Sequence, residues 1–495
     1  MRVLLLFLII LFIQPLCAQE GTDSPAAAEA VDAADTDSAE SAESAEDSSD
    51  AEADAEEKKA AEEKKAQEEK IESLNKEKRE VLLYGIDTEV QDVLGTIRSE
   101  KDTTFNEDLK QLLQTNSNAE INRGVFDFFN EMKVDIARDD ALTLLNNHLD
   151  DYEYTKNLIL SAISYLGAIE AAEAGDTLYN LINDNDQAIA TAALRGIGKL
   201  KDASRVQEIM DLVDEYSGDS EFSDFSAAAI SVLGELGYGE AQIFLEDILQ
   251  DEDAPAAQRQ NAAVSIGRLQ QEEGLALLKS MYSTSQDSLL RSYILHGITW
   301  YEDPEVEALL ITALRDAFWR IRVAAAEGLG ERQSAEAVNI LQYKVRRDPV
   351  RQVRYASIEA LGKIDTPEAG SFLIEQFETE RVAFDIRQKA LDMMLEHKIS
   401  GTIDSLEKVL RPKWSKDNDN ELGPFCKTLS STEWDSLKPF YAEMMAHKDF
   451  IIKIYGIRGV KLNQIASLKD AVKAMDNEKE AINVRREAKA ALESF

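Results

Sequence analysis

The side chains that most often carry catalysis or metal binding are few and scattered in this chain. Four histidines and two cysteines stand far apart in the 495-residue sequence: His148, His296, His397, His447, Cys17 and Cys426. Transition-metal sites need such ligands at short spacings, and none of these residues is paired in that way. The sequence also lacks a Gly-x-x-x-x-Gly-Lys phosphate loop, a Gly-x-Ser-x-Gly nucleophile turn and a His-Glu-x-x-His motif. We therefore expect a protein that is not an enzyme and that uses no metal and no cofactor.

Carboxylates are abundant, but their arrangement is not that of a calcium site. Pairs such as Asp139-Asp140 and Glu272-Glu273 fall in expected turns between helices, where acidic side chains favour helix N-termini. The Asp/Asn alternation around a central glycine that marks an EF-hand is missing. The formal net charge is −40. Because phosphate contacts need positive partners, this charge argues against general nucleic-acid binding.

One stretch departs from the acidic background. Residues 315–354 hold nine lysines and arginines against five acidic residues. Arginines beside aromatic side chains are frequent anchors in protein interfaces, so we expect a patch that binds a protein or peptide partner. Its candidate residues are Arg315, Trp319, Arg320, Lys344, Arg346, Arg347 and Arg351. Two further arginines of this stretch, Arg322 and Arg354, have a structural interpretation.

A recurring glycine indicates the elements that position these residues. Seven glycines follow one another at intervals of 30 to 36 residues: Gly167, Gly198, Gly234, Gly267, Gly297, Gly330 and Gly362. A fixed period in the low thirties is typical of a solenoid, in which each unit is one helical hairpin. We expect each glycine to end a helix in the left-handed conformation, which glycine enters without a Cβ penalty.

The residues around the glycines make the repeat specific. Two copies read Arg322-Val-Ala-Ala-Ala-Glu-Gly-Leu-Gly330 and Arg354-Tyr-Ala-Ser-Ile-Glu-Ala-Leu-Gly362. Three arginines follow an aspartate by six residues, in the pairs Asp253 and Arg259, Asp316 and Arg322, and Asp348 and Arg354.

With this pattern the chain resembles the HEAT-repeat family, in the short-repeat branch that includes phycobilisome lyase-like repeats. The resemblance is strong from about Asn157 to Glu396. It implies an all-α, right-handed α-solenoid of stacked antiparallel hairpins. It also implies that the six paired Asp and Arg residues form a hydrogen-bonded ladder between successive hairpins. The ladder is expected to break where Arg381 stands six residues before Arg387.

Three segments precede the expected solenoid of residues 81–495. Residues 1–18 resemble a secretory signal peptide, with Arg2, the apolar run Val3 to Ile13 and a cleavage site after Ala18. This run is too short for a bilayer core of about 30 Å, so we expect no transmembrane span after signal removal. Lipidation at Cys17 is the alternative to cleavage.

The next two segments differ in composition. Residues 19–55 are rich in Ala, Ser, Asp and Glu and predict a disordered acidic tether. Residues 56–80 contain Glu-Glu-Lys-Lys blocks that predict a charged helix, with a coiled coil as the alternative. Within the solenoid, Pro412, the polar run after it and Gly423-Pro424 predict an irregular repeat at about 411–447.

Two function classes fit these observations. The first is an exported, periplasmic or secreted scaffold that binds a protein or peptide on the concave solenoid surface. The second is a structural spacer of the cell envelope. A groove lined by aromatic and arginine side chains would favour the scaffold, and a uniformly acidic wall would favour the spacer. The resemblance also brings an enzymatic precedent, bilin attachment, but that chemistry is intracellular and the export signal argues against it.

Overall fold

The computed structural model describes residues 72–495, apart from 152–154, 217–221, 417–418 and 493–494. The chain divides into the units Met1–Lys70 and Ile71–Phe495. The expected signal peptide, the expected tether and residues 56–71 of the expected charged helix lie outside the described residues. Residues 72–84 form one helix, which crosses the solenoid boundary expected at residue 81.

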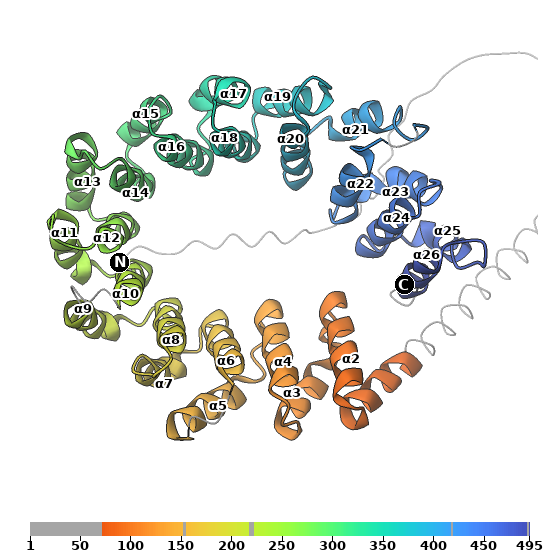
Figure 1. Cartoon of the computed structure of the whole chain (residues 1–495), viewed down its shortest axis with the longest axis horizontal. Coiled ribbons are helices and arrows are strands. Elements are labelled where there is room, and N and C mark those ends of the chain that lie inside the picture. The colour runs from red at the N-terminus through yellow and green to blue at the C-terminus, as the bar shows by residue number, and fades with distance from the viewer. Residues whose placement is uncertain (1–71, 152–154, 217–221, 417–418, 493–494) are drawn as a thin grey trace, which may run out of the picture. The chain divides into compact units, whose positions relative to one another are not determined.

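The second unit is a stack of antiparallel helical hairpins, and its described residues contain no strand. Its helices alternate between an outer and an inner row (Figure 1). The outer row comprises α3 (Asn106–Thr115), α5 (Arg138–Asp151), α7 (Gly175–Leu181), α9 (Val206–Glu215), α11 (Gln242–Gln250), α13 (Glu272–Thr284), α15 (Pro304–Ala313), α17 (Val338–Arg347), α19 (Pro367–Glu378), α21 (Thr402–Leu410), α23 (Lys438–Met445) and α25 (Lys469–Ala474). The inner row comprises α2 (Asp87–Glu100), α4 (Ala119–Met132), α6 (Lys156–Ala168), α8 (Gln187–Leu200), α10 (Ser223–Leu236), α12 (Ala256–Leu269), α14 (Ser288–Thr299), α16 (Trp319–Glu331), α18 (Arg351–Ile364), α20 (Phe384–Glu396), α22 (Leu422–Ser430), α24 (Phe450–Leu462) and α26 (Ile482–Leu492).

Each inner helix packs on the next inner helix, as α10 does on α12 and α16 on α18. The fold class expected from the glycine period, a solenoid of stacked hairpins, is confirmed. Within the described part of the chain, no helix is both long enough and apolar enough to span a bilayer.

The repeat glycines lie in the last turn of the inner helices, where each helix faces its neighbour in the inner row. A Cβ atom added to Gly330 would lie 2.8 Å from the Cα atom of Ala360 on the next inner helix. A Cβ added to Gly267 would overlap the carbonyl oxygen of Gly297. At Gly234, Gly267, Gly297 and Gly330 a side chain would meet the backbone of a neighbouring inner helix and push the two helices apart.

The expectation that these glycines adopt the left-handed conformation is wrong. None of the seven has a positive φ. The left-handed residue that ends the helix stands three positions later in most repeats, for example Lys201 (φ 54°), Gln270 (φ 55°) and Asp365 (φ 47°). Polar residues tolerate this single left-handed position at a helix C-terminus, so the cap does not require glycine.

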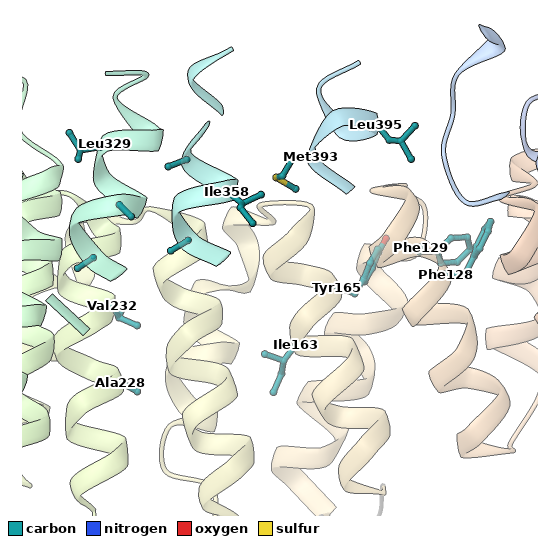
Figure 2. Packing of buried hydrophobic residues seen from close by; sticks show 14 of the residues in the cluster. Phe128, Phe129, Ile163, Tyr165, Ala228, Val232, Leu329, Ile358, Met393 and Leu395 are labelled. Carbon is teal, nitrogen blue, oxygen red and sulfur yellow. The ribbon is translucent and has the colours of Figure 1, made fainter. Parts of the chain in front are cut away.

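Buried apolar side chains form one continuous core along the stack, from Leu82 to Ala491. Figure 2 shows some of its residues, among them Phe128, Phe129 and Tyr165. The Tyr165 hydroxyl donates a hydrogen bond to the Val134 carbonyl at 2.9 Å, so its one polar group is satisfied inside the core. Because each hairpin buries its apolar face against its neighbours, the stability of one repeat depends on the next.

The stretch expected to be irregular, about 411–447, includes the connection between α21 and α22. Buried and half-buried charges lie in the described part of this connection. The Lys413 ammonium lies 3.0 Å from Asp419 and 2.8 Å from Glu421. Glu421 also accepts hydrogen bonds from the guanidinium of Arg387, a side chain that is 1% exposed, at 2.6 and 2.7 Å. The connection is therefore tied to α20 by a cluster of four charges.

Candidate partner-binding surfaces

Outer and inner helices of the central repeats are joined by a turn built on an aspartate. The Asp316 carboxylate accepts a hydrogen bond from the Phe318 N–H at 2.8 Å, and Asp348 accepts one from the Val350 N–H at 3.1 Å. A carboxylate that accepts from the N–H two residues later forms an Asx turn, which explains the aspartate in this place. These turns lie on one edge of the stack. Residues 314–320 and 344–352 are called the turn edge below.

The ladder joins an arginine of one hairpin to the turn aspartate of the next. Arg322 donates to the two carboxylate oxygens of Asp348 at 2.9 and 2.8 Å, and to the carbonyls of Asp316 and Ala317. Asp316 in turn lies 2.8 Å from Arg291 of the preceding hairpin. Asp316 therefore bonds Arg291 through its side chain, and Arg322 only through its carbonyl.

The Arg322–Asp348 pair is buried. The exposed fractions of the two side chains are 8% and 2%. Burial alone would raise the pKa of Asp348, but the hydrogen bonds from Arg322 and the Val350 N–H, with the nearby charge of Lys344, hold that pKa below its usual value. Asp348 is thus a carboxylate that stays ionised inside the stack.

Asp253 does not have the role that the six-residue spacing suggested. Its side chain is exposed. The Asx turn of this hairpin belongs to Asp251, whose carboxylate accepts the Asp253 N–H at 2.9 Å. Two additional residues lie in the turn before α12, so the turn aspartate is eight residues before Arg259 instead of six.

Arg259 and Arg354 have no carboxylate partner among the described residues. Each donates its Nε–H to a backbone carbonyl on the outer helix of the same hairpin: Arg259 to Leu249 at 3.1 Å, and Arg354 to Val345 at 2.9 Å. The partner is missing because the next hairpin lacks the aspartate: Ser285 stands six residues before Arg291, and Arg381 six residues before Arg387.

Three of the seven candidate partner-binding residues are engaged in ion pairs inside the protein. These pairs, with their N···O distances, are Lys344–Asp348 (3.3 Å), Arg346–Glu375 (3.1 Å) and Arg351–Asp385 (2.9 Å). Two of them connect the α17–α18 hairpin to the α19–α20 hairpin. Their charges are therefore partly neutralised before any partner arrives.

The other cations of the turn edge carry no ion pair within the described residues. Arg315, Arg320 and Arg347 are all exposed. The Arg320 guanidinium lies 4.5 Å from the centre of the Trp319 ring, which is half-buried. This stacking keeps the cation over an aromatic face and still accessible to solvent.

The inner row carries a hollow of about 880 Å³, called here the inner hollow, that motif-based reasoning did not find. The apolar side chains that line it come mainly from α8, α10 and α12: Leu160, Ala188, Ala192, Ala227, Ala228, Val232 and Ala257. It is also lined by amide, hydroxyl and charged side chains: Gln187, Thr191, Arg195, Lys199, Asp224, Ser231, Glu235, Gln260, Asn261 and Tyr293. Polar groups from successive helices thus converge on one shallow channel.

A second hollow of about 850 Å³ lies over α14, α16 and α18 and is called the acidic hollow. Trp300, which is 47% exposed, stands at one side, and Glu327 and Glu359 lie in its wall. Burial and the neighbouring Glu359 charge raise the pKa of Glu327. Desolvation lowers the pKa of His296, whose Nε2 lies 3.7 Å from Glu327.

The inner wall carries charges of both signs. Arg268 pairs with Glu235 at 3.2 Å and lies 5.8 Å from the Trp300 ring centre, and Lys363 pairs with Glu331. These ion pairs link neighbouring inner helices along the wall. The wall is therefore neither uniformly acidic nor featureless.

His148 and Cys426 lie outside both hollows. His148 lies 2.8 Å from Asp184, and both side chains are buried. Burial raises the pKa of the Cys426 thiol, which keeps it protonated and unreactive. Across residues 72–495, outside the gaps given above, no three His, Cys, Asp or Glu side chains are arranged to hold a metal ion.

Several solved structures are similar to the chain at low identity. Human deoxyhypusine hydroxylase in complex with glycerol is 18% identical over 52% of this chain and 97% of that chain, with a TM-score of 0.26. The karyopherin Kap121p bound to the extreme C-terminus of the protein phosphatase Cdc14p is 14% identical over 84% of this chain and 53% of that chain, with a TM-score of 0.36. Kap121p bound to Pho4p is 13% identical over 84% of this chain and 50% of that chain, with a TM-score of 0.35. The chain thus matches about half the length of the karyopherin.

The comparison of sequences is more specific. No curated protein matches the chain. A family model described as spirochaete HEAT repeat protein matches residues 82–491, which is nearly the whole described solenoid. By this match the chain belongs to the family of spirochaete HEAT repeat proteins.

Proposed function

We propose that this protein is an exported interaction scaffold that binds an extended segment of a partner protein in the inner hollow. A HEAT-repeat solenoid suggests a protein-interaction scaffold at the level of the fold, but a fold alone does not define a function. The observation that carries the proposal is a hollow that polar side chains and alanines from α8, α10 and α12 line together.

The chemistry of this lining fits a peptide backbone. An extended chain carries one N–H and one C=O per residue, and both need partners when water is removed. The amides of Gln260 and Asn261 both donate and accept hydrogen bonds, so they can bond either group. The alanines of the lining leave room for a backbone to approach, as large side chains would not.

The hollow is lined by charges of both signs. Arg195 and Lys199 lie toward the C-terminal end of α8, while Asp224 lies at the start of α10. Inner helices packed about 8–10 Å apart place three helices across roughly 20 Å, which is the length of about six extended residues. A segment of that length would contact all three helices at once.

The alternative, a structural spacer, fits the inner wall less well. A spacer needs no hollow, and its wall would be uniformly acidic, whereas this wall carries Arg195, Lys199 and Arg268 together with Tyr293 and Trp300. The signal-peptide pattern of residues 1–18 supports the export part of the proposal. Mass spectrometry of the mature protein is expected to show an N-terminus at Gln19; retention of Met1 in the native protein would contradict export by this signal.

A selection of displayed peptides tests the binding site. Peptides selected on the full chain should lose binding when the hollow is filled by Ala188→Trp or Ala257→Trp. The matched control is Ile243→Trp, because Ile243 lies on α11 of the outer row and is 72% exposed. Peptides that bind all three variants equally, or that lose binding only with the control, would place the site outside the inner hollow.

A further inference from the structure

The two free arginines at the ends of α15 and α17 occupy equivalent positions in successive hairpins. Arg315 stands seven residues before the ladder arginine Arg322, and Arg347 stands seven residues before Arg354. Both are exposed, and neither has an ion pair within the described residues. The repeat therefore presents the same cation twice along the turn edge, one hairpin apart.

The acids closest to these arginines in sequence are already engaged. Asp316 is bound by Arg291 at 2.8 Å, and Asp348 by Arg322 at 2.8 Å with a side chain that is only 2% exposed. These carboxylates face the ladder, so they cannot also neutralise Arg315 and Arg347.

A third cation and an aromatic ring lie beside them. Arg320 is exposed and stacks at 4.5 Å over the Trp319 ring, in the first turn of α16. This ring belongs to the same α15–α16 turn as Arg315. A partner that pairs with the arginines thus also meets an aromatic surface, a combination that is common in interface anchors.

We propose that the turn edge binds an acidic, extended peptide segment of a partner protein that carries a carboxylate at every third residue. The inner helices α16 and α18 pack on each other, and packed helices lie about 8–10 Å apart. A segment in the extended polyproline II conformation advances about 3.1 Å per residue with three residues per turn, so every third side chain lies on the same face and one turn matches one repeat. One carboxylate would pair with Arg315, and the next carboxylate, three residues later, with Arg347. This surface is separate from the inner hollow, so it goes beyond the function proposed above.

The length match distinguishes this partner from other anions. A helical acidic segment advances about 1.5 Å per residue and would need six or seven residues for the same step. A nucleic acid would meet the strongly negative field of the rest of the chain, whereas a short carboxylate segment needs only local contacts. The binding is therefore expected to be weak, sensitive to salt and sensitive to register.

Fluorescence anisotropy with two labelled peptides of equal composition tests the register. The first peptide is four copies of Glu-Gly-Ser, and the second has the same residues with the four glutamates adjacent. The full chain is expected to bind the first peptide more tightly at low ionic strength, and to lose about tenfold affinity for it in Arg315→Gln/Arg347→Gln. Equal affinity for the two peptides, or no binding of either, would overturn the proposal.

The matched control removes the same charge from the same edge. Arg346→Gln/Arg351→Gln takes away two arginines that are already paired with Glu375 and Asp385, and it is expected to change affinity by about threefold or less. An equal loss in both double variants would show that the peptide responds to net charge and not to the two free arginines. Circular dichroism and melting verify that all variants keep the fold.

Discussion

Replacement of Arg322 by alanine is expected to destabilise the α15–α18 region strongly. The variant loses two hydrogen bonds to Asp348 and two to backbone carbonyls, and it leaves a carboxylate whose side chain is 2% exposed. Removal of one member of a buried ion pair costs about 3–5 kcal/mol in general. Lys344, which lies 3.3 Å from Asp348, remains as a partial partner. We therefore place the loss toward the lower end, at about 3 kcal/mol.

Urea and thermal unfolding measure the loss, and hydrogen exchange locates it. In a solenoid the stability is roughly a sum over repeats and their interfaces, so one global melting curve can hide a local change. Exchange of the amides in α16 and α18 should accelerate in Arg322→Ala, while α4 and α6 should exchange at the original rate. Asp348→Asn in the same background should restore part of the stability, because it removes the unpaired buried charge.

The pH dependence gives an independent check. The folded pKa of Asp348 lies below its usual value, so the pair contributes stability above the unfolded pKa of about 3.9 and loses it as pH falls through the folded value. The difference between the original protein and Arg322→Ala should therefore be full at pH 7 and shrink below about pH 4.

Arg346→Ala is the control for this prediction. Its ion pair with Glu375 joins side chains that are 46% and 57% exposed, so its loss should cost less than about 1 kcal/mol. Equal shifts for Arg322→Ala and Arg346→Ala, or an Arg322→Ala effect that persists unchanged at low pH, would refute the assignment of Arg322 as a buried ladder residue.

Three further predictions concern other parts of the stack. Gly267→Ala should lower the melting temperature, because the new Cβ overlaps the backbone of the next inner helix. Gly95→Ala, whose Cβ meets nothing within 4 Å, should raise stability by about 0.5–1 kcal/mol. The opposite order of the two variants in thermal unfolding would contradict the role of Gly267 at the helix crossing. Glu421→Gln should accelerate amide exchange in α22, since it weakens the pairing of a guanidinium on Arg387 that is 1% exposed; unchanged exchange would argue against the charge cluster. Cys426 should resist alkylation at pH 8 in the folded protein and react on unfolding, because burial raises its thiol pKa; rapid labelling of the folded protein would refute its burial.

The period of the glycines was sufficient to predict the fold, although the reason given for them was wrong. A glycine that recurs at fixed intervals can be required for a positive φ or for a close approach of two helices. The sequence alone does not distinguish these two causes. Gly297 and Gly330 are required because the backbone of the neighbouring helix occupies the space of a side chain. That neighbour is about 30 residues away in the chain, and only the stacked structure brings it there.

The ladder was also predicted only in part. The ladder was expected between successive hairpins, and the structure pairs Asp316 and Asp348 with the arginine of the preceding hairpin, but it leaves Asp253, Arg259 and Arg354 outside such pairs. Arg291 was missed because it stands six residues before its glycine, while Arg322 stands eight before. The pairs can be found in the sequence only once it is known that a turn aspartate pairs with the arginine of the preceding hairpin.

The inner hollow could not be predicted from motifs. Its lining of alanine, glutamine and threonine side chains carries no distinctive chemistry in any single helix. It becomes a site only because α8, α10 and α12 stand side by side. In the basic stretch, the composition of residues 315–354 identified the cations, but it did not separate Arg315 and Arg347 from residues such as Arg346 that are paired within the protein.

The interrupted ladder has a mechanical consequence. The pairs Arg291–Asp316 and Arg322–Asp348 fasten three consecutive hairpins, from α13 to α18, into one block. At both ends of this block the ladder pair is absent, because Arg259 and Arg354 face hairpins without the aspartate. The joint after α18 is held by more exposed ion pairs, such as Arg346–Glu375. Under a pulling force along the stack, these two joints should open before the joints inside the block. The turn edge lies on that stiff block, so a load carried by the protein would leave Arg315 and Arg347 at a constant separation.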